Sequence, residues 1–291
     1  MPGRLNMNIL VTLNSNYIKP LMVMLKSLFL NNAGETFNIY LMHSSLKGRE
    51  LLCIDKFISQ NGHHLFVIKM HNEDFNKAPV TSYYTKEIYY RLLAFEFLPS
   101  NLHRILYLDP DILVINPIRK LYDTDISGYL YAAAFHNRMS TKEVNKLRLF
   151  PYNIEEYFNS GVLLMNLDLQ RQKIDEKEIY GFVSSNKNRL ILPDQDIINA
   201  LYSKQIKKID EVLFNYDARY YIYYKIASKG VVNMDYIIYN TSIIHFCGKK
   251  KPWNKNYNGK FHSLYKHYEK LAMAGNGQRG RLSKSTSTDG N

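Results

Sequence analysis

The chain has 291 residues, a length that can bury a large hydrophobic core in one domain or in two. Its 46% hydrophobic and 13% aromatic residues are typical of a folded globular protein and exclude a wholly disordered chain. The net charge of +12 favours an anionic partner, whether a phosphorylated small molecule, an acidic membrane or a nucleic acid.

The sequence also predicts where the protein resides. It has no run of about 18 apolar residues and no cationic start that leads into an apolar segment, so we expect neither a membrane span nor an export signal. Cys53 and Cys247 are the only cysteines, too few for a disulfide framework. We therefore expect a cytoplasmic protein.

The first half of the chain alternates short apolar runs with amphipathic helical patterns. The predicted strands are residues 8–13, 37–42, 64–69 and 104–108, and the predicted helices are residues 18–30, 46–61 and 86–97. This order indicates βαβ units. We therefore predict an α/β fold with a mostly parallel, Rossmann-like central sheet and flanking helices.

The second half is less regular. Strands are predicted at 129–135 and 162–166 and helices at 168–185 and 194–204, whereas the tyrosine-dense segment 215–224 receives no assignment. We expect one domain over residues 7–253 and a basic helical extension over 254–272. Residues 273–291, rich in Gly, Ser and Thr, are expected to be a disordered tail or a remnant of cloning.

Two carboxylates, Asp109 and Asp111, follow the apolar run 104–108 and are separated by Pro110. Residues i and i+2 of an extended chain point the same way, and proline keeps the residue before it out of helical angles. The pattern fits either a simple turn or a divalent-cation site at the carboxyl edge of a sheet. The apolar flanks favour the cation site, because burying two adjacent carboxylates is costly without a compensating cation.

A second candidate segment begins at His245, directly after an apolar pair, and continues to Gly248 and Lys251. A lone histidine after an apolar strand is more often a core residue than a ligand. However, Gly248 allows the backbone to approach a ligand closely, and Lys251 can place positive charge against a phosphate. A solvated lysine-rich face remains the alternative interpretation. Similarly, Asp194-Gln195-Asp196 taken alone is typical of a helix start with Asp194 as the N-cap.

Taken together and in this order, these segments resemble glycosyltransferase family 8, the retaining family that includes bacterial lipooligosaccharide galactosyltransferases and glycogenin. The segments that carry the resemblance are Leu13-Asn14-Ser15-Asn16-Tyr17, Tyr89-Tyr90-Arg91-Leu92, Asp109-Pro110-Asp111, Asn159-Ser160-Gly161, Asp194-Gln195-Asp196 and the stretch from His245 to Trp253. The similarity runs from about residue 8 to residue 253, most of the chain. It implies that residues 7–253 form a GT-A catalytic domain and that the protein acts in polysaccharide biosynthesis.

The resemblance also implies roles for individual residues. Asp109, Asp111 and His245 would coordinate Mn²⁺, with Mg²⁺ as the alternative, and imidazole among the ligands suits manganese. Asn159, Asp194 and Gln195 would surround the transferred sugar. The UDP part of the donor would contact Thr12, Leu13, Asn14, Asn16, Tyr17, Arg91, Pro110, Gly248 and Lys251.

The activity implied is transfer of glucose or galactose from a UDP-sugar to a glycan, lipid-linked or protein-linked acceptor, with retention of the anomeric configuration. For the retention we expect front-face attack by the acceptor hydroxyl with Gln195 stabilising the cationic sugar, in preference to a covalent intermediate. Two positions depart from the family pattern. Asn14 stands in the first loop, where many relatives carry an aspartate. His136-Asn137 follows the strand 129–135, where relatives often carry an aspartate as well. The resemblance implies that the second position faces the sugar, so both glucose and galactose remain candidates for the transferred hexose.

Other function classes are weaker. A catalytically weak nucleotide-sugar-binding protein has little need of all three residues Asp109, Asp111 and His245, and no nucleic-acid-binding motif accompanies the basic segment. From Lys249 to Lys270 there are seven lysines against Glu269 alone, interleaved with Tyr257, Phe261, Tyr265 and Tyr268. This segment is either a solvated helix or a contact, through residues 255–270, with the inner face of an anionic membrane.

Overall fold

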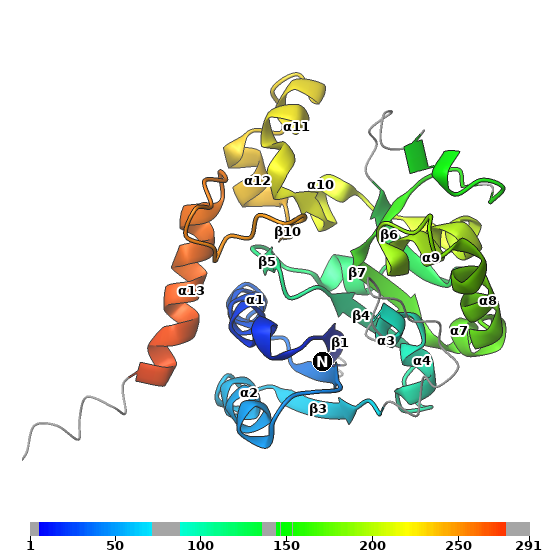
Figure 1. Ribbon diagram of the computed structural model, residues 1–291. Helices are drawn as coiled ribbons and strands as arrows, with labels where there is room; N and C mark the ends of the chain where they lie inside the picture. The colour runs from blue at the N-terminus through cyan, green and yellow to red at the C-terminus, as the bar shows by residue number, and fades with distance from the viewer. Residues whose placement is uncertain (1–5, 72–87, 136–143, 146, 153, 278–291) are drawn as a thin grey trace, which may run out of the picture.

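The computed structural model describes residues 6–71, 88–135, 144–145, 147–152 and 154–277. Its centre is a seven-stranded sheet with the order β3-β2-β1-β4-β7-β6-β8 (Figure 1). The strands are β1 (Met7–Thr12), β2 (Phe37–His43), β3 (His64–Lys69), β4 (Arg104–Leu108), β6 (Tyr131–Phe135), β7 (Phe158–Asn166) and β8 (Ile206–Lys208). β1 to β4 pair in parallel, whereas β7 runs antiparallel to both β4 and β6. The predicted Rossmann-like sheet is confirmed, and a mixed half continues it.

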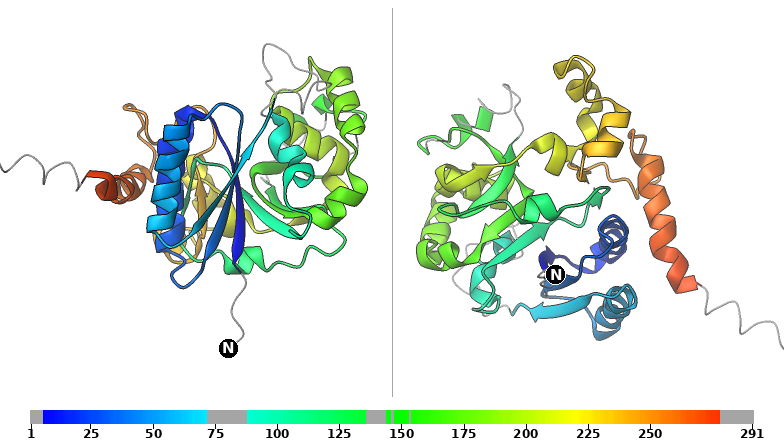
Figure 2. Two further views of the ribbon diagram at one scale, coloured as in Figure 1. Left: turned by 90° about the horizontal axis from the view of Figure 1, so that it is seen from below. Right: turned by 180° about the vertical axis from the view of Figure 1, so that it is seen from behind.

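The sheet is a middle layer with helices on both faces, as Figure 2 shows. In β1, Ile9 and Val11 belong to the core beneath α1 (Ile18–Leu30) and α2 (Gly48–Gln60), whereas Leu10 points into the opposite core. Side chains of a strand alternate between its two faces, and a strand covered on both faces is apolar throughout. This explains the continuous apolar run of β1. The opposite core is closed by α3 (Ile88–Leu92), α4 (Ala94–Phe97), α7 (Leu167–Lys173), α8 (Glu176–Asn186) and α9 (Pro193–Tyr202).

A second, three-stranded sheet lies beside the first and has the order β5-β10-β9. β5 (Ile112–Val114) continues from β4 across the Asp-Pro-Asp link, and β10 (Ile243–His245) pairs antiparallel with it. β9 (Tyr216–Asp217) runs parallel to β10. The remaining short elements are η3 (Ser203–Gln205), which leads into β8 of the large sheet, and α5 (Arg119–Tyr122), α10 (Glu211–Phe214), η4 (Ala218–Tyr220), α11 (Tyr221–Ala227) and α12 (Met234–Asn240). The segment 215–224 thus forms β9, η4 and the start of α11.

The helix predicted at 18–30 is confirmed as α1, but two other predicted helices are wrong in extent. The prediction at 168–185 merges α7 and α8, which are separate because Ile174 and Asp175 are extended and the Asp175 side chain caps α8 by accepting from Lys177 N. The prediction at 86–97 spans α3 and α4, which are interrupted at Leu93, and residues 86–87 lie outside the described residues.

The C-terminal segment ends in one long helix, α13 (His262–Gly277), which packs along α1 (Figure 1). Phe261, Tyr265 and Tyr268, three of the four aromatic residues considered for membrane contact, are buried in this packing. Residues 273–277 of the expected tail belong to α13, and residues 278–291 lie outside the described part. Within the described residues, no helix is both long and apolar enough to cross a membrane.

Candidate functional site

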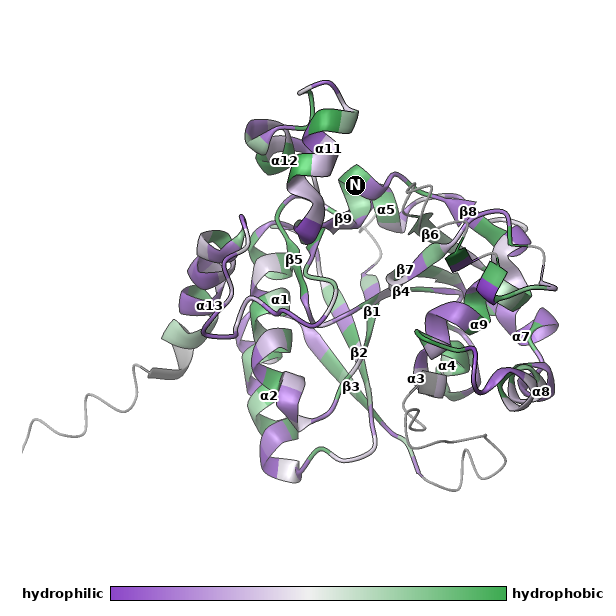
Figure 3. Ribbon diagram, turned by 45° about the horizontal axis from the view of Figure 1, so that its top comes forward, coloured by the Kyte–Doolittle hydropathy of each residue, from purple (hydrophilic) through white to green (hydrophobic). Residues whose placement is uncertain are grey.

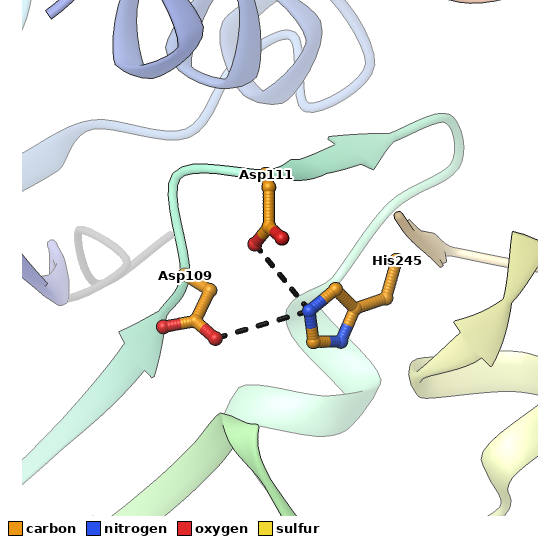
Figure 4. A group of neighbouring side chains, drawn as sticks. All are labelled: Asp109, Asp111 and His245. Carbon is orange, nitrogen blue, oxygen red and sulfur yellow. Dashed lines mark ion pairs between the residues drawn. The ribbon is translucent and has the colours of Figure 1, made fainter. Parts of the chain in front are cut away.

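The Asp-Pro-Asp link connects β4 of the large sheet to β5 of the small one. Asp109 N donates a hydrogen bond to Gly161 O (2.8 Å), and Phe246 N donates to Asp111 O (3.0 Å). Because β10 pairs antiparallel with β5, His245 stands opposite Ile112, next to Asp111. Its imidazole therefore points at both carboxylates (Figure 4), with Nε2 3.4 Å from Asp111 Oδ1 and 3.8 Å from Asp109 Oδ2.

Asp109, Asp111 and His245 suit a metal ion in position and in chemistry. One ligand atom from each lies within 4.8 Å of the others, and His245 and Asp111 are buried. Two carboxylates and an imidazole form a donor set that a first-row transition metal accepts. Gly161 leaves the room for this arrangement, since a Cβ there would lie 2.3 Å from His245 Cε1 and 2.7 Å from Asp109 Oδ2.

Asn215 orients the imidazole. His245 Nδ1 and Asn215 Oδ1 are 2.9 Å apart, and Asn215 Nδ2 donates to Asn159 Oδ1 (2.9 Å). Because Asn215 Oδ1 can only accept, His245 Nδ1 carries the hydrogen, and in the neutral ring Nε2 presents its lone pair to Asp109 and Asp111. This is the arrangement of a metal-ligating histidine with a hydrogen-bonded outer partner.

Positively and negatively charged side chains lie next to one another in the site and shift each other's pKa. Burial raises the pKa of Asp111, but His245 and Lys251 outweigh this effect and hold it below its usual range. Burial lowers the pKa of His245, but Cys247 and Asp111 outweigh it and hold that pKa well above its ordinary value. Lys251 Nζ pairs with Asp111 Oδ2 and also donates to Phe246 O (3.0 Å). A metal ion would compete with the proton on His245.

Arg91, from α3, ties the carboxylates of two segments together. Its guanidinium lies 3.1 Å from Asp109 Oδ1 and 3.0 Å from Asp194 Oδ2, and it donates to Ser160 O (3.1 Å). It also lies over the Tyr107 ring, 4.4 Å from the centroid. Burial lowers the pKa of Arg91, but the pKa is raised overall because Asp109 and its other neighbours stabilise the charge.

Two cavities meet at these carboxylates. The first, of about 350 Å³, is lined by Thr12, Leu13, Asn14, Tyr17, Tyr90, Arg91, Asp109, Pro110, Asp111, Asp194 and Lys251. It contains most of the residues that the resemblance assigns to the UDP part. Asn16 lies in η1 (Ser15–Tyr17), where its N–H donates to Asn14 Oδ1 (3.0 Å), and it is not among the lining residues.

The second cavity, of about 510 Å³, shares Arg91, Asp109, Asp111, Asp194 and Lys251 with the first. The remaining lining residues include Asn145, Arg148, Tyr157, Asn159, Ser160, Ile191, Leu192, Gln195, Arg219, Tyr220, His245, Cys247 and Gly248. Candidate metal ligands therefore stand at the junction of two spaces, which is the arrangement needed when two molecules must meet at one bond.

Gln195, Asp194 and Asn159 lie together on the wall of this second cavity. Gln195 Oε1 accepts from Asn159 Nδ2 (3.2 Å) and from Ser160 N (3.3 Å), and Ser160 Oγ donates to Asp194 Oδ2 (3.0 Å). The N-cap role suggested for Asp194 is wrong, because α9 begins at Pro193 with Leu192 as the cap. Asp194 instead pairs with Arg91.

Gly248 adopts φ +82°, a conformation that favours glycine. A Cβ at this position would also come within 2.8 Å of Arg219 Nη1. Arg219 is held by Asp217, with Nη2 2.6 Å from Asp217 Oδ2. Gly248 thus suits this positive-φ turn, and a side chain there would have to displace the Arg219 guanidinium on the wall of the second cavity.

The fully buried Asp196, which the sequence placed only at a helix start, holds together several residues of this wall. Arg148 contacts both of its oxygens (2.5 and 2.8 Å), and Tyr157 Oη donates to Asp196 Oδ1 (2.5 Å). Ile191 N and Leu192 N also donate to Asp196 Oδ2. No short-range signal identifies Arg148 or Asn215 as partners, whereas Gly161 stands in the Asn159-Ser160-Gly161 segment that carries the family resemblance.

Comparison with known proteins agrees with this geometry. The sequence profile of glycosyl transferase family 8 matches residues 8–257. The chain is 27% identical to general stress protein A of Bacillus subtilis over 90% of this chain and 92% of that protein. It is also 27% identical to a lipopolysaccharide 1,2-glucosyltransferase of Escherichia coli K12, over 86% and 73% of the two chains.

The fold is similar to that of galactosyltransferase LgtC, whose crystal structure holds donor and acceptor sugar analogues. The two have a TM-score of 0.76 at 22% identity, over 91% of this chain and 96% of that one. This likeness establishes the GT-A type of fold. Because the family profile covers most of the sequence, the chain belongs to glycosyl transferase family 8 and is a glycosyltransferase.

Proposed function

We propose that this glycosyltransferase moves a hexose, glucose or galactose, from a UDP-sugar to a carbohydrate acceptor and retains the anomeric configuration. The observation that carries the proposal is the junction of two cavities at Asp109, Asp111 and His245. The similarity to a lipopolysaccharide 1,2-glucosyltransferase and the fold shared with a galactosyltransferase support a hexose as the transferred group.

The first cavity is the proposed binding site for the UDP part of the donor. Thr12, Leu13, Asn14 and Tyr17 offer polar groups and one aromatic ring for the nucleoside, and the Tyr17 ring is held edge-on by Trp253 at 5.9 Å. Asn16, outside the lining, would act only by holding the η1 turn through its bond to Asn14. The uracil and ribose therefore lie at the β1 end of the site.

The diphosphate is proposed to lie over the Asp-Pro-Asp link, between Lys251 and the metal ligands. A divalent ion held by Asp109, Asp111 and His245 would neutralise charge on the diphosphate as UDP departs. We infer Mn²⁺ in preference to Mg²⁺, because His245 supplies an imidazole nitrogen. Lys251, which pairs with Asp111, would pair with a phosphate oxygen of the bound donor. Gly248 has no side chain that would obstruct the diphosphate beside Lys251.

The wall formed by Asn159, Asp194 and Gln195 is proposed to surround the transferred sugar. Asp194 pairs with Arg91 and accepts from Ser160, both through Oδ2, and these contacts stabilise the negative charge and make the carboxylate a weaker nucleophile. Gln195 Oε1 presents a carbonyl dipole next to Asn159. We therefore favour front-face attack by the acceptor hydroxyl, with Gln195 stabilising positive charge on the sugar.

The acceptor is proposed to enter through the second cavity and to be a glycan, on its own or linked to lipid or protein. A peripheral contact of residues 255–270 with an anionic inner membrane face is part of the proposal, carried by lysines, because Phe261, Tyr265 and Tyr268 pack into the core. Truncation before α13 would therefore remove core residues as well as charge. We also propose that residues 7–253 form the catalytic domain and that 254–272 serve as its extension.

The test is a panel of UDP-hexoses incubated with the full chain, simple sugar acceptors and Mn²⁺, Mg²⁺ or a chelator. Proton NMR of the product gives the configuration at the new bond. The expected result is a product of retained configuration with one UDP-hexose and faster transfer with Mn²⁺ than with Mg²⁺. UDP that binds in the presence of Mn²⁺ without any transfer would favour the alternative, a catalytically weak nucleotide-sugar-binding protein. Inverted product would remove the front-face mechanism.

A further inference from the structure

The helices α11 and α12 project from the body of the molecule beside the small sheet (Figure 1), and several of their residues are hydrophobic (Figure 3). We call the exposed apolar residues of this projection the α11–α12 surface: Ile222, Tyr223, Ile226, Val231, Ile238 and Tyr239. Ile226 is 73% exposed, Val231 63% and Tyr239 79%.

This exposure exceeds what the two helices need in order to fold onto the protein. α11 buries Tyr224 and α12 buries Ile237, and these residues belong to the main core. Single exposed apolar side chains are common on protein surfaces, but several of them within residues 222–239 indicate an interaction site. The α11–α12 surface thus presents exposed apolar side chains that do not pack into the core and can contact a partner.

The charges beside this surface identify the partner. Lys225 and Lys229 accompany its apolar residues along the chain, and Asp235 is the acidic residue between Tyr221 and Asn240. Next to α11 lies a hollow of about 390 Å³, whose lining includes Ile222, Lys249, Lys250 and Lys260. Lys260 Nζ lies 6.0 Å from the centre of the Tyr221 ring. Apolar side chains beside a cluster of lysines are typical of a surface that binds an anionic lipid interface.

The hollow also borders the candidate active site. Arg219, Cys247 and Gly248 line both the hollow and the second cavity. A flat anionic layer that meets the lysines of the hollow would therefore lie beside the cavity proposed for the acceptor. An acceptor anchored in that layer would need to extend only a short way to reach it.

We propose that the α11–α12 surface docks on an anionic lipid bilayer, with its apolar side chains in the acyl boundary and the neighbouring lysines against lipid phosphates. The docking brings the second cavity to the membrane surface and makes lipid-linked glycans the acceptor class; this part rests on the proposed transferase function. The α11–α12 contact adds apolar side chains to the lysine contact proposed for residues 255–270, and Lys260 is common to both.

The test is co-sedimentation of the full chain with vesicles of phosphatidylethanolamine and phosphatidylglycerol, or of phosphatidylcholine alone. The double variant Ile226→Asn/Tyr239→Asn is compared with Leu30→Asn/Leu52→Asn, which alters residues that are 48% and 53% exposed on α1 and α2. We expect the wild type and the control to sediment with the anionic vesicles. The α11–α12 variant should lose affinity by on the order of tenfold or more.

Equal binding of both double variants to anionic vesicles would overturn the proposal. So would a wild type that dimerises in sedimentation velocity through this surface, becomes monomeric in the α11–α12 variant and shows no vesicle binding. UDP release from the donor without vesicles is measured in parallel and should be the same in all three proteins. If UDP release is absent while lipid binding depends on Ile226 and Tyr239, the transferase proposal fails and the docking surface stands.

Discussion

The two sheets contribute to the candidate site in different ways. The seven-stranded sheet delivers Thr12 and Asp109 at the ends of neighbouring parallel strands, β1 and β4, where polar residues converge on one edge. The small sheet delivers His245 through a strand of three residues that pairs with β5, far from it in the sequence. One part of the site follows from local strand patterns, and the other depends on long-range pairing.

This difference has consequences for how the protein should respond to substitution. Changes where the two sheets meet should disturb the chemistry more than the fold, because the link that carries Asp109 and Asp111 must coincide with His245 from a distant segment. Changes in the packing of the parallel half should alter stability and leave the donor chemistry intact. Four substitutions test this contrast.

The largest effect is expected for Gly161→Ala at the meeting point of the sheets. The new Cβ would lie 2.3 Å from His245 Cε1, so the imidazole or Asp109 must move. We expect UDP release to fall by about 10²- to 10³-fold, as for the loss of a group that stabilises developing charge. Gly181→Ala in α8 is the matched control, since nothing lies within 4 Å of its added Cβ. Equal activity of the two variants would contradict this account of the junction.

Arg148→Leu should mainly destabilise the wall of the second cavity. It leaves the fully buried Asp196 without its cationic partner, and breaking a buried ion pair in this way costs about 3 kcal/mol of unfolding free energy. Lys208→Met, which breaks the more exposed pair with Glu156, should cost less than about 1 kcal/mol. Chemical denaturation measures both. Similar losses for the two variants would show that Asp196 has other means of compensation.

A smaller effect is expected for Asn215→Ala in the small sheet region. The variant removes the partner of His245 Nδ1 and frees the ring to rotate. Loss of such an outer partner weakens metal affinity by about 10- to 100-fold, and we expect this in a Mn²⁺ titration of UDP release. The control is Asn233→Ala, which removes the cap of α12 away from the ligands. An unchanged Mn²⁺ dependence in Asn215→Ala would mean that the imidazole is positioned by packing alone.

The smallest effect is predicted in the parallel half, at His63. The centres of the His63 and Phe29 rings are 3.9 Å apart. Burial, together with the neighbouring His64, lowers the pKa of His63 to about 4. The unfolded chain then binds the proton more readily, so stability is complete above about pH 6.5 and falls as the pH drops towards 4. His63→Leu should flatten this part of the stability profile in denaturation experiments. A profile as steep as that of the wild type would assign the dependence to other groups.

The same contrast explains how far the sequence could predict the molecule. The helix at 18–30 follows from apolar periodicity and the strands β1 and β2 from short apolar runs, because each of these elements is mostly buried. The split between α7 and α8 was missed because the cap at Asp175 interrupts an otherwise helical pattern. Arg148 and Asn215 act through contacts with distant segments, which no local spacing encodes.

The family pattern predicts that His136 and Asn137 influence the choice of hexose. These two residues lie outside the described part of the chain. Asn14, the other departure from the family pattern, lies in the lining of the first cavity. Its side chain accepts from Asn16 N, so the amide is already oriented by the turn that follows β1. The uracil contact proposed for Asn14 therefore depends on a local turn, which the sequence does encode.

The most direct test of the central claim is UDP release from a UDP-hexose with Mn²⁺ or with a chelator, in the wild type and in Asp111→Asn. The asparagine keeps the shape of the side chain and removes its charge, and thermal melting checks that the variant is folded. The account predicts that the chelator abolishes release by the wild type and that Asp111→Asn is slower by about 10²-fold or more with Mn²⁺ present. Release that persists in the chelator, or a folded Asp111→Asn variant with wild-type activity, would contradict it.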